Sequence, residues 1–288
     1  MKRMLMSASL ALLAVPTDGL AQQEAPTKQA APKAETRAQV RERRLQAAVD
    51  EMVVLVEKYA ELKFEKRPTV RAATHAQWRE LIKKEMEPDG ARELMELTFG
   101  TLGLYLAEVD EVVLSPLVVA PLVKPMRKDP PRHVRLAVAQ QKATVVHELV
   151  HALQQARFGL PASLQAVDDE DVDEILRHRF LVEGHAVFVE ERIAEQELGL
   201  KDFWIKGAYG LWADPAYVTG RRFFLHVFHA EGMAGVHERL KRPPSLKQIV
   251  GLAKRKLPEA RAEVPEKSSK ESSRRADGGE PVKEAGGQ

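Results

Sequence analysis

Cysteine is missing from this 288-residue sequence. Its absence excludes disulfide bonds, a thiolate metal site and a cysteine nucleophile. The folded protein must therefore depend for its stability on a hydrophobic core or on a bound metal ion. Hydrophobic residues make up 44% of the chain and charged residues 30%, so the composition permits a sizeable core.

A large charge of either sign is also missing. The chain has 44 Lys and Arg against 42 Asp and Glu, which gives a net charge of only +2. Proteins whose main partner is nucleic acid or an anionic membrane usually carry a clear basic excess. We therefore expect no nucleic-acid partner, and the sequence gives no indication of the oligomeric state.

Near the start of the chain, the apolar run from Met4 to Val15 is too short to span a bilayer, which takes roughly 20 residues. It follows two basic residues, and Gly19-Leu20-Ala21 then places small residues where signal peptidase cuts. A buried N-terminal helix or a membrane anchor is the alternative. We predict a signal peptide over residues 1–21 with cleavage after Ala21, a secreted or periplasmic protein, and no stable membrane anchor after cleavage.

Composition divides the rest of the chain into three parts. Residues 22–36 are rich in Ala, Pro, Gln, Lys and Thr, and residues 258–288 in Glu, Lys, Ser, Arg and Gly. Neither part has an apolar period, so both are predicted to be disordered, as a linker and a tail. One domain over residues 37–257 remains, without an internal linker or repeat.

Apolar spacing in this domain predicts more helix than strand. Helices are expected at 37–62, 75–86, 91–99, 132–158, 172–198, 215–230 and 233–240, with a short one after Pro243-Pro244. A short strand is expected at 68–72, and two β-rich runs, at 102–106 and 111–119, predict a hairpin. Prolines at 116, 121, 125, 130 and 131 are expected to break up the chain after it. The predicted fold class is α+β, helix-rich with a small sheet.

The segment from His147 to His151 contains the pattern H-E-x-x-H within a helical region. A spacing of four places both imidazoles on one helix face, one turn apart, where they can bind a single ion. Glu148 lies about 100° around the helix, beside such an ion without having to bind it. The neighbouring residues are apolar, which indicates a buried and rigid helix: Val146, Leu149, Val150 and Leu153. The alternative is a pair of histidines satisfied by local hydrogen bonds.

A third ligand is needed, because catalytic zinc usually keeps three protein ligands and one open position. Glu183 lies within an apolar stripe of the predicted helix at 172–198, formed by Leu176, Phe180 and Val187. An unpaired buried carboxylate is costly, so Glu183 should be protonated, salt-bridged or metal-bound, and we expect it to bind the metal. A buried salt bridge to Arg177 or Arg179 is the alternative, and Glu190 is the reserve ligand. Gly184 would let another helix approach closely.

Two segments carry a family resemblance: His147-Glu148-Leu149-Val150-His151-Ala152-Leu153-Gln154-Gln155 and Leu181-Val182-Glu183-Gly184-His185-Ala186. They resemble the gluzincin group of zinc metallopeptidases and, more closely, a group of poorly characterised bacterial exported gluzincins. Tyr217, Gly220 and Phe224 fit a late helix of that group. Pro243-Pro244-Ser245-Leu246-Lys247-Gln248 fits part of its "PPxSTEQ" loop.

The resemblance implies zinc as the cofactor, with His147, His151 and Glu183 as its ligands and Glu148 as the catalytic carboxylate. It also implies a zincin-like domain in which a hairpin or edge strand lines the cleft beside the H-E-x-x-H helix, and residues 103–115 are the candidate. The sequence departs from the group at Leu246 and Lys247, where threonine and glutamate are expected. Val250-Gly251-Leu252 replaces a histidine-proline pair. These changes put the specificity, or the activity itself, in question.

The resulting hypothesis is a zinc-dependent hydrolase, a peptidase, that acts on a peptide or protein substrate with Glu148 as general base. Tyr217 is the first candidate for the donor that steadies the oxyanion, and Tyr209, His226 and His229 are the others. His185 is expected near the ligands or at the surface rather than as a fourth ligand. The alternatives are a non-catalytic zincin-like binding protein of the cell envelope, and a helical structural protein with a coincidental pattern.

Overall fold

The structure is a computed structural model that describes residues 35–86, 90, 101–125, 128–160, 171–200 and 215–257. Every helix and strand in these ranges belongs to one unit, which begins at Arg37. Several predicted features lie outside the described residues: the signal peptide, most of the linker at 22–36, the helix at 91–99, the tail at 258–288 and Tyr209.

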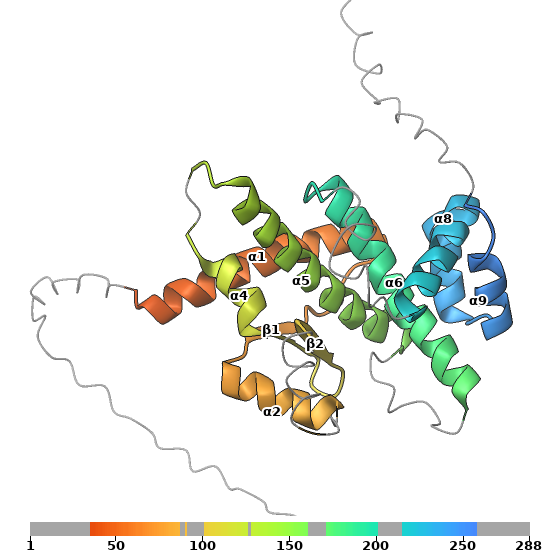
Figure 1. The fold of residues 1–288 in the computed structure, drawn as a ribbon, viewed down its shortest axis with the longest axis horizontal. Helices are drawn as coiled ribbons and strands as arrows, with labels where there is room; N and C mark the ends of the chain where they lie inside the picture. Colours follow the sequence, from red (N-terminus) through yellow and green to blue (C-terminus); the bar gives the residue numbers. More distant parts are fainter. Residues whose placement is uncertain are drawn as a thin grey trace, which may run out of the picture. The chain divides into compact units, whose positions relative to one another are not determined.

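The described part of the chain is a helix-rich α+β fold, as predicted (Figure 1). Its helices are α1 (Arg37–Ala60), α2 (His75–Met86), α4 (Pro116–Val123), α5 (Arg132–Phe158), α6 (Val172–Gln196), α8 (Pro215–Lys241) and α9 (Leu246–Ala253). Its strands are β1 (Thr69–Ala72), β2 (Gly103–Leu106) and β3 (Glu111–Leu114). Apart from α4, the apolar period thus predicted these helices closely, because each buries a stripe against the others.

The three described strands form one small sheet in the order β1-β3-β2. β1 runs parallel to β3, whereas β2 pairs with β3 in antiparallel fashion as the expected hairpin, with Tyr105 opposite Val112. Trp78 and Ile82 of α2 pack against Val113 of β3 and so cover one face of the sheet. β2 forms an edge of the sheet and contacts α5.

The prediction that a β-rich run extends to residue 119 is wrong. β3 ends at Leu114, and the chain then forms helix α4, which begins at Pro116 and holds Pro121 within it. Proline is well tolerated in the first turn of a helix, because the N–H that it lacks would have no partner there. Val118 and Val119 are fully buried, and α4 packs on α1 and α5. Tertiary packing therefore overrides the β propensity of this segment.

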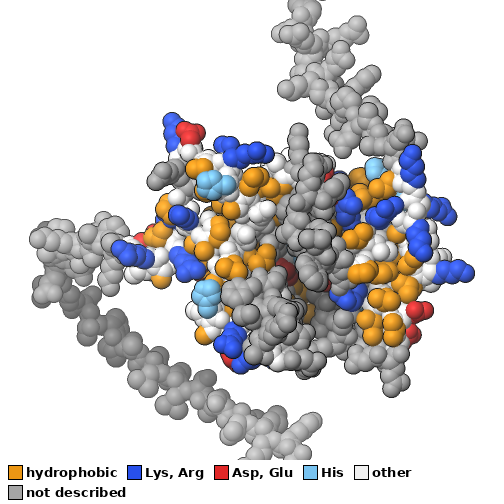
Figure 2. Space-filling model, viewed as in Figure 1, with side chains coloured by type: hydrophobic (Ala, Val, Ile, Leu, Met, Phe, Trp, Pro, Cys, Tyr) orange, Lys and Arg blue, Asp and Glu red, His pale blue; other side chains and the backbone are white. Residues whose placement is uncertain are grey.

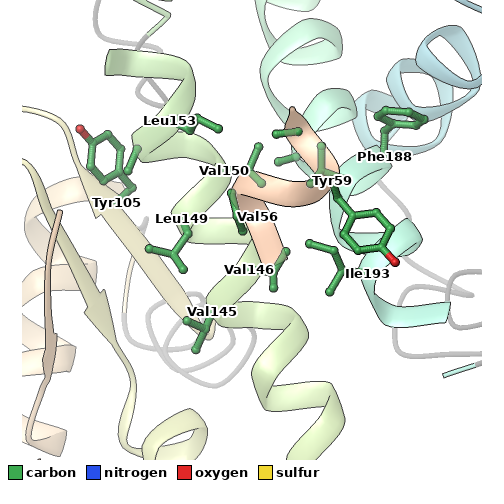
Figure 3. Packing of buried hydrophobic residues seen from close by; sticks show 14 of the residues in the cluster. Val56, Tyr59, Tyr105, Val145, Val146, Leu149, Val150, Leu153, Phe188 and Ile193 are labelled. Carbon is green, nitrogen blue, oxygen red and sulfur yellow. The ribbon is translucent and has the colours of Figure 1, made fainter. Parts of the chain in front are cut away.

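Helix α5 lies at the centre of the hydrophobic core (Figure 3). Its side chains Val145, Val146, Leu149, Val150 and Leu153 are buried. They lie between Tyr105 of β2 on one side and residues of α1 and α6 on the other, among them Val56, Tyr59, Phe188 and Ile193. Burying one such aliphatic side chain contributes about 1.5–3 kcal/mol. The segment that carries the H-E-x-x-H pattern is therefore fixed from several sides.

Helices α6 and α8 touch backbone to backbone at Gly184 and Gly220. A Cβ atom on Gly184 would lie 2.3 Å from the Gly220 Cα, and one on Gly220 would lie 2.1 Å from the Phe180 carbonyl oxygen. No other residue type fits this crossing without separating the helices. The close approach expected at Gly184 is thus observed, and a largely buried ion pair between Glu191 and Arg221 joins the same two helices.

Helix α8 is interrupted at Gly232, whose φ of 68° and ψ of −166° are not helical. The break agrees with the two helices predicted for this part of the chain. Among the described residues, no helix is both long and apolar enough to cross a membrane. On the face shown in Figure 2, Lys and Arg side chains gather over α8 and α9, with hydrophobic side chains between them.

Candidate metal centre

Three side chains converge where α5 packs against α6. The ligand atoms of His147, His151 and Glu183 all lie within 4.8 Å of one another. The Glu183 Oε2 atom is 3.3 Å from His147 Nε2 and 3.6 Å from His151 Nε2. The two imidazole rings lie edge to face with 4.7 Å between their centroids. This group could hold a metal ion.

Arg177, one of the two alternative partners of Glu183, pairs with Glu174 one helical turn away. The imidazoles are thus the observed partners of the Glu183 carboxylate. Burial acts to raise the pKa of Glu183, but His151 and His147 outweigh it and hold that pKa well below its usual range. The carboxylate is therefore charged, as a metal ligand must be.

Two imidazole nitrogens and one carboxylate oxygen form a donor set that suits zinc at a catalytic site, where three protein ligands leave a position open. The ring of His147 shows how its two nitrogens are used. Its Nδ1 atom lies 3.0 Å from Glu190 Oε2, while Nε2 faces Glu183. Burial alone would lower the pKa of His147, but Glu183 and Glu190 together raise it well above its usual value.

Glu190, the reserve candidate for the third ligand, lies on the far side of the His147 ring and is 2% exposed. Its carboxylate accepts a hydrogen bond from Nδ1, which orients the ring and leaves Nε2 directed at Glu183. Burial raises the pKa of Glu190, although His147 opposes this. Glu190 follows Glu183 by two helical turns on the same face of α6, a spacing that the sequence already contained.

The ring of His151 has a partner that the sequence analysis missed. Its Nδ1 atom lies 2.9 Å from the Oε1 atom of Gln154, which is fully buried. His185 is fully buried as well, with its Nδ1 atom 3.1 Å from Gln154 Nε2. A glutamine three residues after a histidine, on the same face of the predicted helix, was the signal available in the sequence. His185 thus contacts a ligand's partner and does not lie at the surface.

Glu148, the predicted catalytic carboxylate, is 8% exposed and lies against the edge of β2. Its carboxylate accepts a hydrogen bond from the backbone N–H of Tyr105. Burial raises the pKa of Glu148, while the charges of His147 and His151 oppose the rise. A Cβ atom on Gly103 would lie 2.6 Å from Glu148 Cγ, so the strand can approach this side chain only because residue 103 is glycine. The edge strand therefore lies beside the H-E-x-x-H helix, where residues 103–115 were expected.

No family model, curated protein or solved structure matches this chain. Any assignment to a family therefore depends on the residues of this centre and on their geometry.

The candidates for an oxyanion donor occupy different places. The ring centroid of Tyr217 is 6.1 Å from that of His147, so this side chain lies beside the centre. His226 instead binds the Arg255 carbonyl oxygen at 3.1 Å, and His229 is exposed on α8. Of the three described candidates, Tyr217 alone is placed next to a potential metal ligand. The Gly184–Gly220 crossing fixes its position, because Tyr217 precedes Gly220 by one turn of α8.

Proposed function

We propose that this protein is an exported, zinc-dependent peptidase of the gluzincin type. Its metal ligands are His147, His151 and Glu183, and its general base is Glu148. One observation carries the proposal: three ligand atoms from two helices converge within 4.8 Å, and Glu148 lies beside them. The signal-like start of the chain supports export.

The donor set supports zinc as the resident ion. Imidazole and carboxylate ligands suit zinc, and the absence of cysteine excludes sites of the thiolate kind. Each histidine also keeps Nε2 toward the centre while Nδ1 binds a protein oxygen, as metal-binding histidines commonly do. A bound zinc ion supplies Lewis-acid chemistry, which lowers the pKa of water and polarises a carbonyl group.

The protein's own residues have distinct tasks in this proposal. The Glu148 carboxylate takes a proton from the attacking water and later delivers it to the departing amine. The Tyr105 N–H and Gly103 hold Glu148 in place from the strand side. The Tyr217 hydroxyl donates a hydrogen bond to the oxyanion as it develops, a contribution worth about 3 kcal/mol in comparable sites.

Strand β2 supports a peptide substrate over other hydrolase substrates. In the described sheet β2 pairs only with β3, so its other edge faces Glu148. Backbone groups alternate between the two edges of a strand, and the Tyr105 N–H accordingly points away from β3. While the Tyr105 N–H stays bound to Glu148, an extended peptide can pair with the other backbone groups of this edge, which would lay it alongside the metal ligands.

The late loop departs from the expected pattern at Leu246 and Lys247, but it still caps the helix that follows it. Ser245 and Gln248, which match the expected pattern, form a capping box at the start of α9. The two residues that differ, Leu246 and Lys247, lie inside the helix between the capping residues, and Lys247 is exposed. The changes therefore alter the exposed side of α9 at Lys247 and a contact with the core at Leu246, and not the cap that begins the helix.

The test is Glu148→Gln, with Glu238→Gln as a matched control at a partly exposed position of α8. We expect Glu148→Gln to retain one zinc ion per chain and to lose about 10²–10⁴-fold in the rate of hydrolysis of an unstructured protein. Glu238→Gln should behave as the wild type. Unchanged hydrolysis by Glu148→Gln would refute the role of Glu148.

Two further measurements separate the alternatives. Wild-type protein that binds zinc but hydrolyses no peptide bond would favour the non-catalytic binding protein. Wild-type protein that binds no zinc would favour a structural protein with a coincidental pattern. Glu183→Ala should sharply reduce the zinc content, because only the two histidines of the three-residue group would remain.

A further inference from the structure

The side chain of Gln154 makes three buried contacts, one with His151 on its own helix α5 and two with α6. Its Oε1 atom lies 2.9 Å from His151 Nδ1. Its Nε2 atom lies 2.8 Å from the Val182 carbonyl oxygen and 3.1 Å from His185 Nδ1. The amide is fully buried, so no solvent competes for these contacts. It follows Glu148 and His151 along α5 and contacts α6 on either side of Glu183.

The Val182 carbonyl oxygen determines the orientation of the Gln154 amide, that is, on which side its NH₂ group and its oxygen lie. A carbonyl oxygen can only accept a hydrogen bond, so the amide group that faces it must be the NH₂ group. The other amide hydrogen then points to His185 Nδ1, which must accept it. The oxygen of the amide is left facing His151 Nδ1, and an oxygen can only accept. His151 must therefore carry a proton on Nδ1.

This protonation has a direct consequence for metal binding. A neutral imidazole that carries its proton on Nδ1 offers the lone pair of Nε2, and His151 Nε2 is the atom that faces Glu183. We propose that Gln154 is a positioning residue that holds His151 in the Nδ1–H tautomer and ties it to the turn of α6 that carries Glu183. Gln154 thereby orients two of the three ligands without touching the metal. This inference rests on the proposed metal site.

The network is arranged for the centre and not for stability alone. The Nε2 atom of His185 is buried and has no hydrogen-bond partner among the described residues. A buried polar atom without a partner destabilises the folded state, whereas apolar side chains of similar shape in place of Gln154 and His185 would avoid that cost. Packing alone does not account for these buried polar groups, whereas the contact of Gln154 with His151 does.

The test compares Gln154→Met with Gln155→Met, a matched change at the next position of α5. The Gln155 Oε1 atom has no hydrogen-bond partner in the described structure, so its loss removes no contact from the centre. We expect Gln154→Met to weaken zinc binding by about 10–100-fold in competition with a chelator, as the loss of partners behind a ligand does elsewhere. Gln155→Met should bind zinc like the wild type. Gln154→Glu keeps an acceptor for His151 Nδ1 and should recover part of the affinity.

A second readout begins with the wild-type protein and reports the tautomer directly. Nitrogen-15 spectra of the histidines in metal-free wild-type protein, at a pH of about 9 where an ordinary imidazole is neutral, report the tautomer of His151. We expect the Nδ1–H tautomer in the wild type and a shift toward Nε2–H in Gln154→Met. A His151→Asn variant identifies the signal.

The outcomes distinguish this inference from the proposed function. An Nε2–H tautomer of His151 in the wild type overturns the role of Gln154, even if zinc binds. Equal zinc affinity of Gln154→Met and Gln155→Met overturns it as well. Wild-type protein that binds no zinc overturns the proposed function instead, while an Nδ1–H tautomer in that protein would still support the hydrogen-bond assignment.

Discussion

Gly103→Ala tests whether the position of Glu148 matters for catalysis. The added Cβ atom would lie 2.6 Å from Glu148 Cγ, 2.9 Å from Oε1 and 3.0 Å from Cδ. Carbon atoms in contact normally lie about 3.5–4.0 Å apart, so one partner must move by about 1 Å. Strand β2 is held by its pairing with β3, so we expect the Glu148 side chain to move.

The expected loss follows from the geometry. A displacement of about 1 Å at a reacting group can cost about 100-fold in rate, which corresponds to about 2.7 kcal/mol of activation free energy. We expect Gly103→Ala to lower kcat/KM for an unstructured protein substrate by about that factor. Zinc stoichiometry should stay at the wild-type value, because the clash involves Glu148 and none of the three ligands.

Gly251→Ala is the matched control for this experiment. Gly251 lies in α9, and a Cβ atom there would meet nothing within 4 Å. The same chemical change should leave activity unaltered and slightly raise stability, since alanine favours the helix. Gly103→Ala with wild-type kcat/KM and full zinc content would refute the reasoning, because the position of Glu148 would then have no bearing on the rate.

Four further predictions concern stability and metal content. Removal of zinc by a chelator should abolish hydrolysis and lower the melting temperature. The loss in free energy of unfolding should reach about 4 kcal/mol if zinc had been present at about 1,000 times its Kd. Added zinc should restore both properties, as calorimetry and activity assays would show. Gly220→Ala should reduce the free energy of unfolding by at least about 1–3 kcal/mol and lower the melting temperature accordingly, because its Cβ would lie 2.1 Å from a backbone oxygen of α6. A wild-type melting curve would contradict the observed crossing. Arg192→Met should reduce the free energy of unfolding in urea by about 1–2 kcal/mol. The guanidinium lies 4.3 Å from the ring centroid of Phe228 and donates a hydrogen bond to the Tyr59 carbonyl oxygen, and an unchanged midpoint would show that both contacts are dispensable. The pKa of Glu57 lies below its usual value near 4.5, because the Lys63 ion pair and a backbone hydrogen bond outweigh burial. The stability that Glu57 contributes should therefore be present above a pH near 4.5 and be lost as the pH falls through the lowered pKa. In a pH series of melting temperatures, Glu57→Gln should lose less stability in acid than the wild type does.

The H-E-x-x-H pair could be predicted from sequence because its geometry is local. Residues four apart in a helix always share a face, whatever the helix packs against. The same reasoning predicted α5, α6 and the interruption of α8, since each depends on a short-range period or on a single glycine. It failed at residues 115–119, which begin a helix because two valines there are buried against α1 and α5.

The partners of the centre were decided by the tertiary structure. Glu183 lies 36 residues from His147 along the chain, and only the packing of α6 on α5 brings the two side chains together. The apolar stripe predicted that Glu183 faces the interior, where its side chain is 18% exposed. It did not predict which nitrogen Glu190 would contact or that Gln154 would bridge the helices. Nor did it show that Gly103 would lie against Glu148. Periodicity determines which face of a helix is buried, whereas the rotation and offset of two packed helices depend on side chains distant in the sequence.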